Sequence, residues 1–271
     1  MITINTFYLK SKTDKLKRFC HRYSIVILGI ISLFSSEPVF CQKNCDFFYK
    51  KDSPEHCACM LLYGDKFEDA DYYQGSRKSQ ALCDSAIALY PTFADAYYIK
   101  SIPFLKRGEF EIWKTINDKA VAYDTLAYLG YRGGVQFMFL RNYEAAIKDI
   151  ETLQAIADWD DLGTIYNGEY DLEIIRALAY KGLGDSIKAL DILENHLNKT
   201  NDAGLWGYYH LGVMYYRQNR YNDAMQAFLN QISSNEIADA HYYIGLIHKK
   251  RRNHTAFQES IKKAHDLYVS G

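Results

Sequence analysis

The stretch Tyr208–Phe228, with the sequence YYHLGVMYYRQNRYNDAMQAF, contains the pattern that decides the fold. Read at helical spacing, it predicts two short helices separated by a tight turn at 218–220. The apolar and small residues of each helix share one face: Leu211, Gly212 and Tyr215 on the first, and Tyr221, Ala224 and Phe228 on the second. Gly212 and Ala224 matter most, because small side chains allow two helices to approach closely.

One such helix pair cannot bury its own apolar face, so the chain must supply neighbouring pairs. The small residues that correspond to Gly212 are Gly134, Ala177 and Gly245, with separations along the four of 43, 35 and 33 residues. A further unit at 92–125 carries the same pattern in Tyr97, Ser101, Phe104, Gly108, Phe110, Trp113 and Ala120. The spacing predicts a series of stacked helix pairs.

This pattern resembles the tetratricopeptide repeat family, in which an aromatic residue, Leu-Gly, Tyr, Ala and Phe recur at these offsets in a unit of 34 residues. The resemblance implies an all-α fold, an α-solenoid of about six helix-turn-helix repeats wound into a right-handed superhelix. We expect the repeat domain to span 57–271 and to begin with a degenerate repeat at 57–91. Pro103 departs from the pattern and is expected to kink its helix.

The first 41 residues have a different composition from the rest of the chain. Six Lys and Arg residues precede an uncharged apolar run at 25–34, which is shorter than the ~20 residues of a membrane span. Val39 and Cys41 are small enough for a signal-peptidase site. The sequence therefore predicts a signal peptide at 1–41 and a mature chain that begins at Gln42. An uncleaved anchor and a lipoprotein with lipid on Cys41 are the alternatives.

Residues 42–56 are polar and rich in turn-forming residues, and we expect them to precede the repeats. After removal of 1–41, four cysteines remain: Cys45, Cys57, Cys59 and Cys83. An even number in an exported chain is compatible with two disulfides, whose linkage the sequence does not determine. The alternative is a metal site formed by these cysteines and His56, although the paired Cys-x-x-Cys spacing of zinc sites is missing.

The segment 158–171 (DWDDLGTIYNGEYD) is inserted between the third and fourth repeats. Five of its residues occupy the positions 1, 3, 6, 8 and 12 of an EF-hand calcium loop: Asp158, Asp160, Gly163, Ile165 and Glu169. Leu162 replaces the oxygen ligand at position 5. The segment is therefore interpreted as a solvated loop, with a calcium site as the alternative.

No motif for catalysis, phosphate binding or zinc binding occurs in the sequence, so we expect no enzyme activity and no cofactor. The formal net charge of −1 argues against binding to nucleic acid, which requires a concentrated basic face. The basic run at 249–252 (KKRR) lies where a first helix of a repeat should end, and it is interpreted as a solvated turn.

The family resemblance implies a binding site on the first helices of the repeats, whose residues at offsets 2, 5, 9, 12 and 13 line a concave groove. In this chain the aromatic and basic residues at such offsets include Tyr98, Lys106, Trp206, Tyr209, Tyr216, Arg217, Tyr242 and Lys249, which are the predicted partner-binding residues. Aromatic and Arg side chains dominate the energetics of many interfaces. We expect the groove near the fifth and sixth repeats to bind a hydrophobic-aromatic peptide or protein segment, with or without acidic residues.

Two other possibilities accompany this expectation. Tyr209 and Tyr216 would instead pack within the stack if their rings fill space between repeats. The whole chain would instead act as a structural or assembly component of a bacterial envelope if its convex face or its ends make the contacts. In either case the signal peptide predicts export to the periplasm or the envelope, with no membrane span after cleavage.

Overall fold

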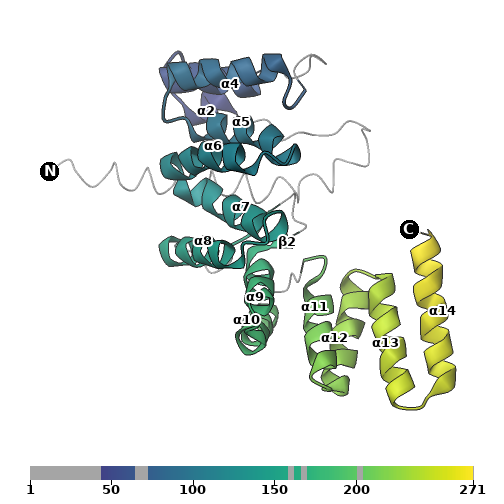
Figure 1. The fold of residues 1–271 in the computed structure, drawn as a ribbon. Helices are drawn as coiled ribbons and strands as arrows, with labels where there is room; N and C mark the ends of the chain where they lie inside the picture. The colour runs from purple at the N-terminus through teal and green to yellow at the C-terminus, as the bar shows by residue number, and fades with distance from the viewer. Residues whose placement is uncertain (1–43, 65–72, 158–161, 166–169, 200–203, 271) are drawn as a thin grey trace. The chain divides into compact units, whose positions relative to one another are not determined.

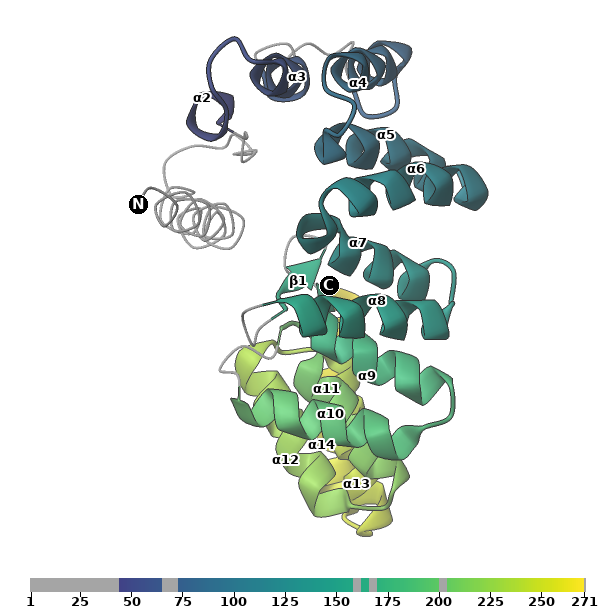
Figure 2. The ribbon, with the colours of Figure 1, turned by 90° about the vertical axis from the view of Figure 1, so that its left-hand side faces the viewer.

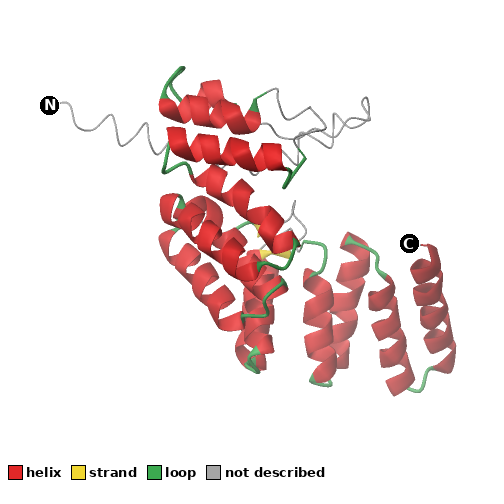
Figure 3. Ribbon diagram, turned by 45° about the horizontal axis from the view of Figure 1, so that its top comes forward, coloured by secondary structure: helices red, strands yellow, loops and turns green. Residues whose placement is uncertain are grey.

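A computed structural model describes residues 44–64, 73–157, 162–165, 170–199 and 204–270. Within these residues the chain is almost entirely helical, as the predominance of helix in Figure 3 shows. It divides into two compact units, of which the first ends at Ile116 and the second begins at Asn117. The division falls inside helix α6 (Phe110–Tyr123).

The first unit contains the helices α2 (Cys45–Phe48), α3 (Pro54–Tyr63), α4 (Arg77–Leu89), α5 (Ala94–Lys106) and the first part of α6 (Figure 1). Its core combines cysteines and alanines with two larger side chains: Cys45, Ala58, Cys59, Leu62, Cys83, Ala86, Phe93 and Ala96. The helices α3 and α4 form the predicted first repeat. Pro103 lies near the end of α5, where its ring lies close to Gly75.

The structure differs from the expected polar segment at 42–56 in two places. A short helix, α2, forms at Cys45–Phe48, and α3 begins at Pro54 rather than after His56. The reason is local chemistry at 53–54. Ser53 accepts a hydrogen bond from the backbone N–H of His56, and a proline at the first helical position has its φ preset for the helix.

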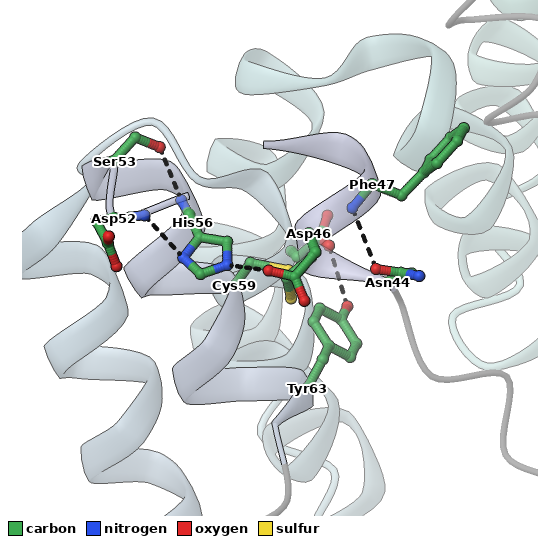
Figure 4. Close-up of a disulfide and its surroundings, with 10 residues drawn as sticks. Asn44, Asp46, Phe47, Asp52, Ser53, His56, Cys59 and Tyr63 are labelled. Carbon is green, nitrogen blue, oxygen red and sulfur yellow. Dashed lines mark hydrogen bonds and ion pairs between the residues drawn. A yellow bond between two sulfur atoms is a disulfide. The ribbon is translucent and has the colours of Figure 1, made fainter. Parts of the chain in front are cut away.

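A disulfide ties α2 to α3 through Cys45 and Cys59, which lie 14 residues apart in sequence (Figure 4). His56 supports the same junction, since its Nε2 lies 2.9 Å from Oδ1 of Asp46. The backbone N–H of Asp52 donates to Nδ1 of His56 at 3.3 Å, so a neutral ring carries its proton on Nε2 and donates it to Asp46.

The two remaining cysteines among the described residues, Cys57 and Cys83, are free thiols. Of the two predicted disulfides, the structure thus forms one. Burial raises the pKa of Cys83 to about 12, so this thiol stays protonated at neutral pH. Among the described residues, no group of three or more His, Cys, Asp or Glu side chains has the arrangement of a metal site.

The second unit contains the rest of α6 and four helix pairs, in which consecutive helices run side by side, as for α7 and α8 in Figure 2. The pairs are α7 (Thr125–Met138) with α8 (Tyr143–Ile156), α9 (Leu172–Gly182) with α10 (Ser186–Lys199), α11 (Gly207–Arg217) with α12 (Tyr221–Ser234), and α13 (Ala238–Lys250) with α14 (His254–Ser270). Successive pairs also contact one another, which makes this unit a stack of repeats.

Glycines mark the closest approach of the two helices within a pair. A Cβ atom added at Gly212 would lie 2.6 Å from Cε1 of Phe228, and one added at Gly245 would lie 3.0 Å from Cδ1 of Ile261. The equivalent glycine of α7 is Gly133, where an added Cβ would lie 3.1 Å from Cγ1 of Ile150 on α8. The register predicted from the sequence placed Gly134 there and is therefore off by one residue in this helix.

In each repeat from the second onward, a residue with positive φ follows the first helix in the turn to the second helix. These residues are Gly108, Arg141, Gly184, Asn219 and Arg252. Their separations of 33, 43, 35 and 33 residues reproduce the predicted repeat spacing, including the longer third interval. At four of the five turns the N–H of the following residue bonds the carbonyl five positions back, as Asp185 does to Tyr180 at 3.0 Å, and this satisfies a helix-end carbonyl.

The inserted segment accounts for the longer interval. Two short antiparallel strands, β1 (Thr164–Ile165) and β2 (Tyr170–Asp171), form within it. Ile165 is buried against α7, where a Cβ added at Gly134 would lie 2.0 Å from its Cδ1. The insertion is therefore not a wholly solvated loop, because Leu162 and Ile165 join the core shared with α7, α8 and α9.

The helix α14 closes the second unit at its C-terminal end. Only Ala264 of this helix is fully buried. Its exposed face carries the charged residues Glu259, Lys262, Lys263 and Asp266. A polar outer face of this kind keeps the end of a repeat stack soluble.

Candidate functional site

The eight residues predicted to bind a partner lie in two places. Tyr98 and Lys106 belong to α5 in the first unit, and the other six belong to α11 and α13 or to the residue that precedes α11 in the second unit. In the first unit, burial and then the negative charge of Asp95 raise the pKa of Tyr98. Asp95 is itself buried and accepts a hydrogen bond from the Tyr63 hydroxyl at 3.0 Å. The exposed Lys106 donates to Gln74 at 2.5 Å.

In the second unit, α11, α12 and α13 build an aromatic cluster, which comprises Tyr209, Tyr216, Tyr221, Phe228, Tyr242 and Tyr243. Tyr243 is its centre. Its ring stacks on Phe228 at 5.2 Å between centroids, and it meets the edges of Tyr216 at 5.4 Å and Tyr209 at 6.1 Å. Sequence reasoning missed Tyr243, because its offset in the repeat faces neighbouring helices rather than the groove.

Within this cluster the predicted residues have different surroundings. Tyr209 and Tyr216 are half-buried and pack on the core, and burial is the first cause of the raised pKa of each phenol. Tyr242 remains 48% exposed while its ring touches Tyr243. Tyr209 and Tyr216 thus pack against neighbouring helices of the stack, as in the alternative described above. Tyr242 instead lies at the solvent-exposed edge of the aromatic cluster, called its free edge below.

Two exposed cations lie on α11 and α13, two of the helices that build the aromatic cluster. Arg217 lies at the end of α11, near enough to Tyr209 to oppose the rise in its pKa. Lys249 lies in the last turn of α13, with its Nζ 5.6 Å from the centroid of the Phe257 ring. An aromatic edge beside cations presents apolar area and positive charge together, which suits a segment that carries aromatic and acidic side chains.

Trp206 lies apart from the aromatic cluster and lines a pocket between the first helices α7, α9 and α11. The pocket has a volume of about 350 Å³ and is lined by Phe137, Met138, Asp171, Ile174, Ile175, Leu178, Gly204, Leu205, Trp206 and His210. Its walls are mainly apolar. Asp171 has a structural role at the edge of the helix, because its carboxylate caps α9 by accepting hydrogen bonds from the N–H groups of Glu173 and Ile174.

Two cations, Lys181 of α9 and Arg217 of α11, lie on the helices that line this pocket. Burial, and then the positive charge of Lys181, lower the pKa of the pocket residue His210 to about 4, so His210 is neutral at pH 7. Burial, and then the charge of Arg217, lower the pKa of Lys181. The two cations are thus close neighbours. Neither has a carboxylate within ion-pair distance among the residues that the structure describes.

Comparison with known structures adds to this geometry. The chain is similar to YrrB, described as a TPR protein with an unusual peptide-binding site, at 20% identity over 68% of this chain and 91% of that one, with a TM-score of 0.51. It is also similar to PilF of Pseudomonas aeruginosa, at 17% identity over 72% and 85% of the two chains, with a TM-score of 0.56. The chain has the tetratricopeptide repeat fold.

A third structure with the tetratricopeptide repeat fold is PilW, described as a type IV pilus biogenesis factor. It shares 14% identity over 72% of this chain and 87% of that one, with a TM-score of 0.57. No protein-family model and no curated protein matches the sequence. The likeness is therefore one of fold, and the site must be argued from the residues of this chain.

Two predicted features outside the groove can be placed on the tetratricopeptide repeat fold. The basic run at 249–252 ends α13 and forms the turn into α14, as expected from its place in the repeat. Of the residues compared with a calcium loop, Gly163 has φ +81° and Ile165 is buried, whereas Asp158, Asp160 and Glu169 lie outside the described residues.

The described parts of the chain contain no helix with both the length and the hydropathy needed to cross a bilayer. The predicted signal peptide and its cleavage site at 39–42 lie outside the described residues.

Proposed function

We propose that this protein is a binding scaffold, without catalytic activity, that holds a peptide or a segment of a partner protein against the first helices of its repeats. The proposed centre is the free edge of the aromatic cluster on α11 and α13. The observation that carries the proposal is the position of Tyr242, a large aromatic side chain left 48% exposed on a rigid aromatic base, with cations on both helices.

The energetics of this surface support the proposal. A tyrosine supplies a large contact area with few rotatable bonds, so fixing it on binding costs little conformational entropy. The Tyr243 ring under Tyr242 restricts it further. Among structures of the same fold, YrrB is described as having a peptide-binding site, which fits a role in peptide recognition for this chain.

We also propose that the protein is exported. The Cys45–Cys59 disulfide supports this location, because such bonds persist in oxidising compartments and are rare in the reducing cytosol. The mature chain would then act in the periplasm or at the envelope of a bacterial cell.

The test of the binding proposal is selection of peptides from a phage-displayed library of random dodecapeptides on the purified full chain. Binding of the selected peptides is then measured by fluorescence polarisation. The change Tyr242→Ala should weaken binding at least tenfold. Tyr268→Ala is the matched control, because Tyr268 is 81% exposed on α14 and lies outside the aromatic cluster. Equal binding by both variants would contradict the proposed centre of the site.

A further inference from the structure

The pocket beside Trp206 is lined by α9 and α11, and the cations Lys181 and Arg217 lie in the last turns of the same two helices. The surface that runs from the pocket to these cations is called the α9–α11 groove. On α9, Ile174, Leu178 and Lys181 are spaced four and three residues apart and so share one face of the helix. On α11, His210 and Arg217 are seven residues apart, again on one face. Both helices are first helices of successive repeats, so they run in the same direction.

The two ends of this groove have opposite chemical character. Ile174, Leu178 and His210 belong to the pocket, and His210 is neutral, so the N-terminal end of the groove is apolar. Lys181 and Arg217 lie about 10 Å further along, at 1.5 Å of rise per residue from Ile174 and His210. This end is positive.

A bound anion would stabilise the cations at the positive end of the groove more than it would stabilise an ordinary surface cation. Lys181 is half-buried, and a second positive charge lies close to it. Burial and repulsion both disfavour the charged ammonium, and the attraction of a carboxylate bound between the two cations would offset both effects. By contrast, other cations of the same unit have acidic neighbours: Arg132 with Asp149 at 2.7 Å, and Arg220 with Asp223 at 2.7 Å.

We propose that the groove between α9 and α11 binds an acidic peptide segment, whose bulky apolar side chain enters the pocket beside Trp206 and whose carboxylate lies between Lys181 and Arg217. This inference rests on the proposed function, because it names the chemistry of the segment bound by the same scaffold. Arg217 joins the groove to the aromatic cluster, since it lies near both Lys181 and Tyr209.

The geometry also sets the spacing of the recognised residues. An extended chain advances about 3.3 Å per residue, so the separation of about 10 Å corresponds to about three residues. The expected motif is therefore a Phe, Leu or Met side chain with an Asp or Glu two to four positions away. An acidic residue directly next to the apolar one would not reach both ends.

The experiment repeats the phage selection with random dodecapeptides on the full chain and on the double variant Lys181→Glu, Arg217→Glu. The unaltered protein should select the apolar-acidic motif, and the double variant should prefer Lys or Arg at the acidic position. The original peptides should bind the double variant at least tenfold more weakly. The double variant Lys262→Glu, Lys263→Glu makes an equal charge change on the exposed face of α14; it is the control and should select the original motif.

A variant with a filled pocket, Leu178→Trp, gives an independent reading. It should lose the preference for the apolar side chain and keep the preference for the acidic one, with an unchanged helical circular-dichroism spectrum. An acidic preference that survives the double charge reversal would overturn the inference, as would selected peptides without acidic residues.

The outcomes also separate this inference from the proposed function. Binding that is lost with Tyr242→Ala and unaffected by the charge reversal would support the proposed aromatic centre and overturn the α9–α11 groove. Binding that responds to the charge reversal and not to Tyr242→Ala would support the groove and contradict the aromatic centre. Failure to select any peptide would contradict both.

Discussion

Gly212 shows how one residue sets the distance between two helices. An added Cβ would meet the Phe228 ring at 2.6 Å, and Phe228 is fully buried, so the ring has no free space to move into. Replacing Gly212 with Leu should therefore overpack the α11–α12 pair and lower the free energy of unfolding by ~1–3 kcal/mol. Urea denaturation measures this change.

The matched control is Gln226→Leu, which places the same side chain on the exposed face of α12. It should leave the free energy of unfolding within a few tenths of a kcal/mol of the original value. A midpoint for Gly212→Leu as high as that of the control would show that Gly212 does not lie at the contact between the two helices.

His210 ties stability to pH. Its pKa is about 4 in the folded chain, below its ordinary value of 6.5, so the unfolded chain binds the proton more tightly. The contribution of neutral His210 is fully present above pH 6.5 and is lost as the pH falls toward 4. The loss amounts to about 2–3 kcal/mol at pH 4.5, at about 1.36 kcal/mol for each pH unit below 6.5.

The measurement is the free energy of unfolding in urea at pH 7 and at pH 4.5. Other groups also titrate in this range, so the comparison is with His210→Gln, which has no proton to bind. The variant should lose less stability than the unaltered chain on acidification. Equal losses would mean that His210 is accessible to water and titrates normally.

The turn that ends each first helix is the element that repeats most faithfully. Gly184 adopts φ +90° with no atom within 4 Å of an added Cβ, so any penalty for Gly184→Ala comes from the backbone alone. A residue with a Cβ in this conformation costs about 1 kcal/mol. Arg252 pays this cost at φ +57° in the turn between α13 and α14.

The two turns therefore predict opposite changes. Gly184→Ala should lower the melting temperature, and Arg252→Gly should raise it, each by a few degrees because about 1 kcal/mol is at stake. Differential scanning calorimetry of both variants tests the pair. A change of the same sign in both would mean that the positive φ is not what these positions share.

The element spacing was predictable because each repeat depends on local rules. Small residues at helical spacing and a break between the helices located Gly212, Gly245 and the turn after α13 directly from the sequence. The interval of 43 residues also identified an insertion. Its packing was not predictable, because Ile165 reaches Gly134 through a tertiary contact that no helical period encodes.

The residues of the candidate site were also predictable only in part. The repeat offsets identified Tyr242, Lys249 and Arg217 as exposed side chains. They did not reveal that Tyr209 and Tyr216 lean on Tyr243, since that contact depends on how α11 and α13 pack. They omitted His210, whose altered pKa follows from burial and from the charge of a neighbouring helix. Lys181 lies at offset 12 of the fourth repeat, a groove offset, but its burial and the nearby charge of Arg217 were not predictable from that offset.

For the whole molecule, the predicted signal peptide has a direct consequence. Cleavage after Cys41 should give a mature chain that begins at Gln42 and forms the Cys45–Cys59 disulfide after export. Intact-mass measurement of protein purified from the native cell envelope tests both features. Retention of residues 1–41, or a lipid adduct on Cys41, would contradict the cleavage and support the anchor or lipoprotein alternative.

The central claim is that a partner segment lies against the first helices, beside the aromatic cluster. Photo-crosslinking tests it most directly. The photoreactive residue p-benzoylphenylalanine replaces Tyr242 in one protein and Tyr268 in another, and each is irradiated with a selected peptide. The account predicts a covalent peptide adduct at position 242 and none at position 268. An adduct confined to position 268, or equal at both, would contradict it.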